Sequence, residues 1–230
     1  MRKVVFLLVF FYSACFIFHK TAPYDARPEI PPPTGTASLD TFKPSDNTNL
    51  ESLVYLPATS CRLTYFNQND GRWAQTNYGP QNSIQIYGCG PTVLAMLVSS
   101  LTQNYIPPDE MAAWAYEHGF FSQNSGSFHS IIPEGAAQWG MTAEPLQDIS
   151  YESILHQLHD GKLIVMLMGT GQFTSSGHFI IVRGVSVSGK LQIADPNSSE
   201  NTMTEWDYET LRKEIKKNTG PDGSVWAIAK

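Results

Sequence analysis

Apolar and polar residues divide the chain into three stretches of different character. Residues 4–18 form a continuous apolar run, and residues 21–57 are mostly polar and rich in proline. From residue 58 to residue 230, spaced apolar positions alternate with short polar turns. Only this last stretch has enough regularly placed apolar residues to bury a core. We therefore predict one folded domain at 58–230.

The first half of this domain has the apolar spacing of helices. After Gly90 and Pro91, apolar residues recur every three or four positions as far as Leu101, which predicts a helix. A proline in the first helical turn is favourable, because the N–H group that it lacks would have no partner there. The same reasoning predicts three further helices, near 107–118, 130–139 and 151–159.

The second half contains uninterrupted apolar runs of strand length. Runs at 163–168 and 178–185 suit buried strands, and a third at 191–194 follows a short Gly/Ser turn. Such a turn predicts an antiparallel hairpin between the second and third runs. A helix near 208–216 and a strand at 225–228 complete the chain. Helices followed by strands predict an α+β fold.

Residues 1–20 have the features of an export signal. Arg2 and Lys3 precede the run at 4–18, whose fifteen residues are fewer than the about 20 that a membrane-spanning helix needs and suit a signal peptide. No small-x-small cleavage site is evident, so an uncleaved signal anchor is the alternative, and lipidation at Cys15 stays open. Residues 21–57 hold seven of the fifteen prolines and predict a disordered linker. We expect an extracellular or cell-surface protein that contacts the membrane through its N-terminal segment only.

The charge and the cysteines narrow the function classes. A formal net charge of −6 gives no basic surface for nucleic acid, which we exclude as a partner. Without Cys15, two cysteines remain, and the sequence leaves open whether Cys61 pairs with Cys89. Because no C-x-x-C pair is present, no zinc motif is predicted. We expect neither a metal nor an organic cofactor. We also expect a monomer.

Cys89 is the candidate nucleophile. It lies in the sequence Tyr-Gly-Cys-Gly-Pro-Thr, at the predicted start of a helix. The N–H groups and the positive end of a helix dipole lower the pKa of a thiol in that position and increase its thiolate fraction. A cysteine at a helix start is also common as a structural residue, so this position alone does not establish a catalytic role.

His178 and Asp195 are the candidate partners of this thiol. His178 opens a predicted strand after the Gly/Ser-rich loop 169–177, and Asp195 ends the neighbouring strand. An aspartate beside the histidine would accept the imidazole N–H, fix its tautomer and stabilise its charged form. The alternatives are a surface histidine and an ordinary Asp-Pro turn. Asn197 is a second candidate for the role of Asp195, while the other candidate histidines are weaker: His118, His129, His156 and His159.

Gln68 is the candidate oxyanion donor. It precedes Cys89 by 21 residues in a predicted loop, and its side-chain amide could act together with the Cys89 backbone N–H. Gln85 is a second candidate for this donor, because it lies nearer to Cys89 in the sequence.

Several of these segments together resemble a known family. The run Tyr65–Asp70, the segment Gly88–Met96, the stretch Gly177–Ile180 and the Asp-Pro-Asn at 195–197 occur in the order found in stand-alone relatives of the double-glycine leader peptidases. These are papain-like cysteine peptidases of the bacteriocin-processing type. The resemblance spans roughly residues 63–228. It implies a papain-like fold, in which N-terminal helices pack on an antiparallel sheet.

By the family pattern, Cys89 is the nucleophile, His178 the base, Asp195 the orienting residue and Gln68 the oxyanion donor. The match departs from the family in one respect, because no transporter domains follow. Transport-coupled cleavage and specificity for a double-glycine site are therefore not implied. We expect an exported peptidase that acts on peptides or proteins through an acyl-enzyme thioester. The alternatives are a cell-wall or side-chain amide hydrolase or transferase with the same triad, and a catalytically silent binding domain.

Overall fold

The computed structural model describes residues 54–57, 62–219 and 223–230. The predicted export signal and nearly all of the predicted linker lie outside these residues. No helix within the described ranges is both long and apolar enough to cross a membrane.

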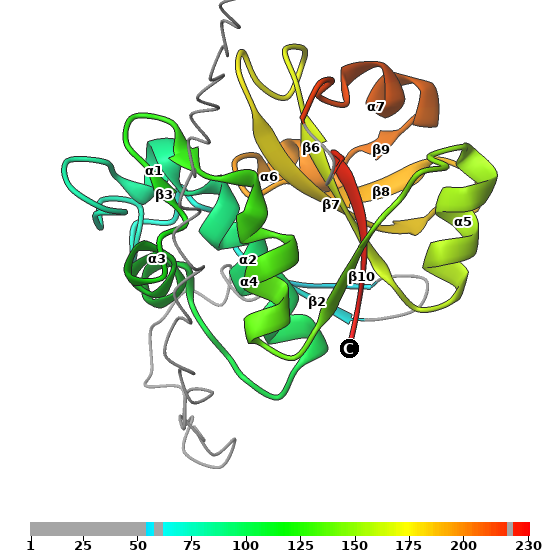
Figure 1. Cartoon of the computed structure of the whole chain (residues 1–230). Coiled ribbons are helices and arrows are strands. Elements are labelled where there is room, and N and C mark those ends of the chain that lie inside the picture. Colours follow the sequence, from blue (N-terminus) through cyan, green and yellow to red (C-terminus); the bar gives the residue numbers. More distant parts are fainter. Residues whose placement is uncertain (1–53, 58–61, 220–222) are drawn as a thin grey trace, which may run out of the picture. The chain divides into compact units, whose positions relative to one another are not determined.

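A six-stranded antiparallel sheet forms the centre of the domain (Figure 1). The strand order is β5-β10-β6-β7-β8-β9. The bounds are β5 Thr142–Pro145, β6 Leu163–Met168, β7 His178–Val185, β8 Leu191–Ala194, β9 Glu205–Trp206 and β10 Val225–Ala229. The sequence predicted the bounds of β6, β7 and β8 and the antiparallel β7–β8 hairpin, and all four are confirmed.

Helices precede and flank this sheet. They are α1 Ile84–Tyr87, α2 Cys89–Leu101, α3 Pro108–Glu117, α4 Pro133–Gln138, α5 Tyr151–His159, α6 Ser199–Met203 and α7 Tyr208–Glu214. Two short hairpins complete the elements, β1 Val54–Pro57 with β2 Arg62–Tyr65 and β3 Phe121–Ser122 with β4 Gly126–Ser127.

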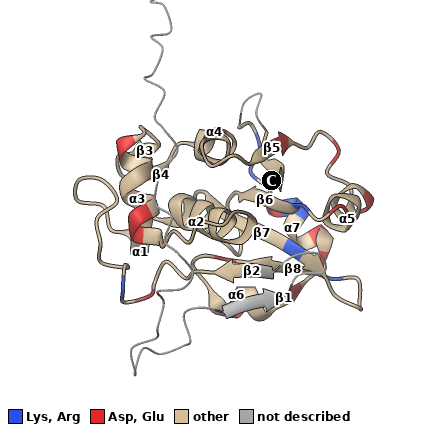
Figure 2. Ribbon diagram, turned by 90° about the horizontal axis from the view of Figure 1, so that it is seen from below, with Lys and Arg blue, Asp and Glu red and all other residues tan. Residues whose placement is uncertain are grey.

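Both faces of the sheet are covered, which explains the continuous apolar runs. One core cluster joins α2, α3 and α4 to a sheet face that includes Val165 and Ile181. A second cluster lies on the other face, under α5 and α7, and includes Met166 and Val182. Strands that are buried on both faces do not alternate between apolar and polar residues. Figure 2 shows α2 and β6 without charged residues, whereas acidic residues lie on the outer helices α3 and α5.

Three boundaries differ from the sequence-based prediction. Residues 54–57, at the end of the predicted linker 21–57, form strand β1, which pairs with β2. The helix expected at 130–139 is a 3₁₀ turn at His129–Ile131 followed by α4, which begins at Pro133 because proline has no N–H for an interior helical turn. The helix expected at 208–216 ends at Glu214, where the chain turns to run beside the end of β6.

Candidate active site

Cys89 lies at the first position of α2, directly after the short helix α1. Its side chain is half-buried and carries a free thiol. Burial raises the pKa of this thiol. The hydrogen bond and charge of His178 and the backbone N–H groups of Phe179 and Gly90 lower it by more, so the net pKa is below that of an ordinary cysteine. The position therefore favours a thiolate.

His178 lies between Cys89 and Asp195. Its Nε2 donates to Asp195 Oδ1 at 2.7 Å, and only 6% and 1% of these two side chains are exposed. Because Nε2 is occupied, Nδ1 is the ring nitrogen that remains for Cys89. Burial lowers the pKa of His178, but the hydrogen bonds and charges of Asp195 and Cys89 raise it to about 10. These opposite shifts of the two pKa values favour a thiolate–imidazolium pair.

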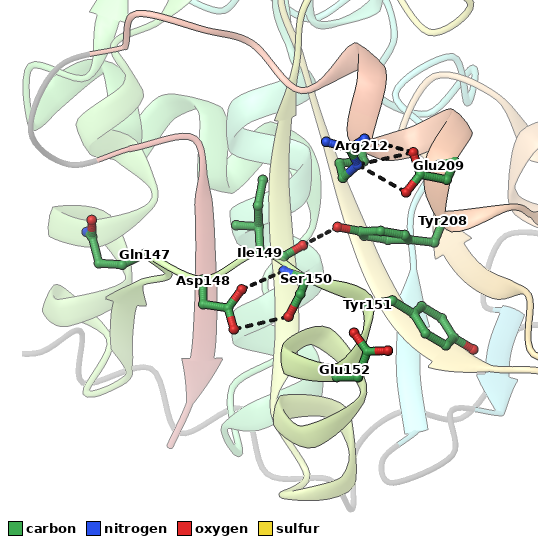
Figure 3. Close-up of a pocket in the computed structure, with 9 residues that line it drawn as sticks. All are labelled: Gln147, Asp148, Ile149, Ser150, Tyr151, Glu152, Tyr208, Glu209 and Arg212. Atoms are coloured by element: carbon green, nitrogen blue, oxygen red, sulfur yellow. Dashed lines mark hydrogen bonds and ion pairs between the residues drawn. The ribbon is translucent and has the colours of Figure 1, made fainter.

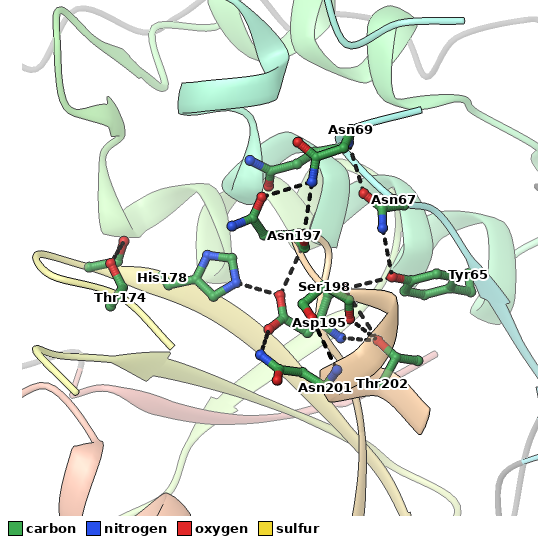
Figure 4. A network of polar contacts seen from close by, with 12 residues as sticks. Tyr65, Asn67, Asn69, Thr174, His178, Asp195, Asn197, Ser198, Asn201 and Thr202 are labelled. Atoms are coloured by element: carbon green, nitrogen blue, oxygen red, sulfur yellow. Dashed lines mark hydrogen bonds and ion pairs between the residues drawn. The ribbon is translucent and has the colours of Figure 1, made fainter. Parts of the chain in front are cut away.

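A polar network fixes Asp195 behind the imidazole (Figure 4). Oδ2 accepts from Asn201 Nδ2 at 2.8 Å, and Oδ1 accepts from the Asn197 backbone N–H at 2.8 Å. The Asp195 carbonyl accepts from the Tyr65 hydroxyl, and its N–H donates to Thr202 Oγ1. Burial raises the pKa of Asp195, but its hydrogen bonds, led by that of His178, lower it by more, so the net pKa is below that of an ordinary aspartate. This carboxylate therefore stays charged while it orients the ring.

Sequence reasoning did not identify Asn201, Thr202 or Tyr65 as residues that hold Asp195. Asn201 and Thr202 lie on α6, whose N-cap Ser198 accepts from the Asn201 N–H at 3.0 Å. A serine followed three residues later by a polar residue is a helix-start signal, so this short helix was accessible from the sequence. Tyr65 is 130 residues away in the sequence, and only the tertiary structure brings it to Asp195.

Gln68 is buried beside this network. Its backbone N–H donates to the Pro196 carbonyl at 2.7 Å, and its Nε2 donates to the Gln85 carbonyl at 2.8 Å. Its Oε1 is buried and has no hydrogen-bond partner among the described residues. These bonds fix Gln68 between the chain before Cys89 and the turn after Asp195.

The two fallback residues have other contacts. The Gln85 side chain is exposed and accepts from Gln75 Nε2 at 2.9 Å. Asn197 Oδ1 accepts from Asn69 Nδ2 at 2.9 Å and not from His178. The geometry thus brings together Cys89, His178 and Asp195, while the catalytic role of each remains a prediction.

The four other candidate histidines have surroundings that differ from those of His178. His118 stacks on the Trp114 ring, and His156 pairs with Asp160 on the exposed face of α5. His159 is exposed at the end of the same helix. His129 is half-buried, and its ring lies edge-on to that of Phe179 at 6.2 Å between centroids.

A surface pocket of about 560 Å³ lies away from these groups, between the start of α5 and α7 (Figure 3). The Tyr208 hydroxyl donates to the Ile149 carbonyl there, and Arg212 pairs with Glu209. Its polar groups are thus largely paired with one another. Within the described ranges, no group of three or more His, Cys, Asp or Glu residues is arranged to hold a metal ion.

One comparison with known proteins finds a family for this chain. The Peptidase_C39 like family matches residues 62–226, which include every residue of the site described above. A comparison with proteins of curated function finds no match.

Proposed function

Because the chain belongs to the peptidase C39-like family, we propose that it is a cysteine peptidase with Cys89 as nucleophile, His178 as general base and acid, and Asp195 as the residue that orients His178. Membership of the family confirms the resemblance and the papain-like α+β fold predicted from the sequence. One observation carries the proposal: the His178 ring lies between the Cys89 thiol and the Asp195 carboxylate, which it contacts at 2.7 Å, and this arrangement lowers the pKa of the thiol and raises the pKa of the imidazole. Perturbed pKa values of this kind concentrate at functional sites.

The proposed acylation begins with the thiolate. The Cys89 sulfur attacks the carbonyl carbon of the scissile amide, and the carbonyl oxygen becomes an oxyanion. The second N–H of the Gln68 amide and the Cys89 backbone N–H are the proposed donors to this oxyanion. The first N–H groups of a helix have no partner within that helix, which makes the Cys89 N–H suitable.

His178 then completes the reaction. Its imidazolium gives a proton to the leaving amine as the C–N bond breaks, which leaves a thioester on Cys89. The neutral imidazole takes a proton from a water molecule, and the resulting hydroxide attacks the thioester. Collapse of that intermediate releases the carboxylic acid and restores the thiolate–imidazolium pair. Asp195 holds the ring in the required tautomer throughout.

The test compares the full chain with its Cys89→Ala variant on casein, a peptide library and purified peptidoglycan. Cleavage of peptides by the native chain, its loss in the variant and selective alkylation of Cys89 at neutral pH would support the proposal. Full activity of Cys89→Ala would refute it, as would a Cys89 that is no more reactive than a free thiol. Fragments from peptidoglycan alone would assign the triad to cell-wall amides.

A further inference from the structure

The loop that leads into His178 is hydrogen-bonded at its start to the last residue of α7 and to the residues that follow it. Gly169, at the start of the β6–β7 loop, donates its N–H to the Glu214 carbonyl at 2.6 Å. The Lys216 N–H donates to the Leu167 carbonyl at 2.8 Å. Figure 1 shows this loop and the end of α7 at the same end of the sheet. Residues 214–216 are therefore fixed against the base of the loop.

The side chain of Lys216 crosses that base. A Cβ added to Gly169 would lie 3.3 Å from the Lys216 Cα, and one added to Gly177 would lie 3.0 Å from the Lys216 Nζ. The ammonium group is thus beside the residue that directly precedes His178. Because Gly177 has no side chain, it does not cover this ammonium group.

Lys216 has no carboxylate within ion-pair distance among the described residues. The carboxylate of Glu214, two residues earlier in the chain, instead accepts from the Gln172 backbone N–H at 2.8 Å and from its amide at 3.3 Å. A half-buried lysine that has no anionic partner within the described ranges and lies near His178 is available for an anionic ligand.

The charge of Lys216 also acts on His129, which lies on the helical side of the domain. It begins the 3₁₀ turn before α4, and its ring packs edge-on against Phe179, the residue after His178. Burial and the charge of Lys216 lower the pKa of His129, so at neutral pH it is an uncharged ring that can donate one N–H. The two side chains thus flank the stretch Gly177–Phe179 from different parts of the fold.

We propose that Lys216 and His129 form a subsite that binds a substrate carboxylate on the leaving-group side of the scissile bond. The inference rests on the proposed peptidase function. His178 must reach the leaving amine to protonate it, so groups that flank His178 lie on the side of the leaving fragment. The oxyanion donors, Gln68 and the Cys89 N–H, come from other segments. The carboxylate belongs either to an acidic side chain just after the cleaved bond or to a C-terminus close to it.

The first experiment uses two probes of similar size, iodoacetate and iodoacetamide, on the full chain. Their alkylation rates at Cys89, followed by peptide mapping, give a ratio that reports attraction of a carboxylate. Lys216→Met is expected to lower this ratio by about threefold, which corresponds to about 0.6 kcal/mol, and Lys216→Arg is expected to keep most of it, because a partly exposed charge pair contributes less than about 1 kcal/mol. Lys217→Met is the matched control, since it removes the same charge from an exposed neighbour.

The second experiment uses substrate pairs that differ only in charge. One pair has Glu or Gln directly after the cleaved bond, and the other has a free or an amidated C-terminus. In Lys216→Met, the ratio of kcat/KM for the anionic member to that for the neutral member should fall about fivefold to tenfold. This fall is expected for the pair whose carboxylate binds in the subsite. His129→Ala should lower the same ratio by a smaller factor.

The outcomes separate the two proposals. If Cys89 reacts and peptides are cleaved but Lys216→Met leaves both ratios equal to those of Lys217→Met, the subsite does not exist. An acidic preference located on the acyl side of the bond also overturns it. If Cys89 reacts with neither probe faster than a free thiol, the peptidase proposal fails and the subsite fails with it.

Discussion

The imidazole of His178 is bound to the carboxylate of Asp195 at 2.7 Å in a region almost closed to solvent. Asp195 is in turn held by Asn201 and by the Asn197 N–H, so the carboxylate cannot turn without breaking several hydrogen bonds. A charge buried in this way is strongly destabilised when its partner is removed. The pair is therefore the least replaceable contact of the site.

The first prediction concerns that contact. Asp195→Asn should lower kcat/KM by about 10² to 10⁴, because the ring loses the acceptor that fixes its tautomer. The pKa of His178 should also fall, since Asp195 raises it. The pH dependence of Cys89 alkylation and of peptide cleavage measures both effects. Asp160→Asn removes a carboxylate from the exposed His156 pair and should change neither.

A second prediction follows from the two pKa shifts. The reactive pair needs a thiolate, which exists above the lowered pKa of Cys89, and an imidazolium, which exists below the pKa of His178 at about 10. Cleavage should therefore begin at a lower pH than the ionisation of a free thiol would allow, and should decline as the pH rises through about 10. A profile that rises only near pH 9 would contradict the thiolate–imidazolium pair.

The third prediction separates Gln68 from Gln85. Gln68→Ala should lower kcat by about 10² to 10³, because an oxyanion donor acts mainly in the transition state. Gln85→Ala removes a side chain that bonds Gln75 at the surface and leaves its carbonyl in place, so it should have little effect. Steady-state kinetics of both variants decides between the two glutamines. Equal losses in the two would leave Gln68 without a special role.

The fourth prediction concerns packing next to the nucleophile. A Cβ on Gly90 would clash with Ser127 Oγ, and this hydroxyl is hydrogen-bonded to that of Tyr78. Gly90→Ala should therefore destabilise the domain by about 1–3 kcal/mol, although alanine normally favours a helix over glycine. Chemical denaturation measures the free energy of unfolding. Ser127→Gly in the same chain should recover part of the loss, and purely additive effects of the two changes would argue against the clash.

Much of the architecture could be read from local patterns. Continuous apolar runs of strand length predicted β6, β7 and β8 with their observed bounds, because burial on both faces makes such runs distinctive. The start of α2 at Cys89 was accessible because proline and glycine mark a helix start. Strands β1, β5 and β9 were missed, since short edge strands show little apolar periodicity and depend on their partners.

The sequence by itself determined the fold class, the family and the identity of the four candidate site residues, because apolar periodicity and ordered motifs are local properties of the chain. The tertiary structure alone decided their surroundings: which nitrogen of His178 meets Asp195, and that Gln68 rather than Gln85 is buried near the turn after Asp195. It also decided that Asn201 and Tyr65 hold Asp195, and that Lys216 reaches Gly177. These are contacts between segments far apart in sequence, and their distances depend on packing that no local pattern encodes.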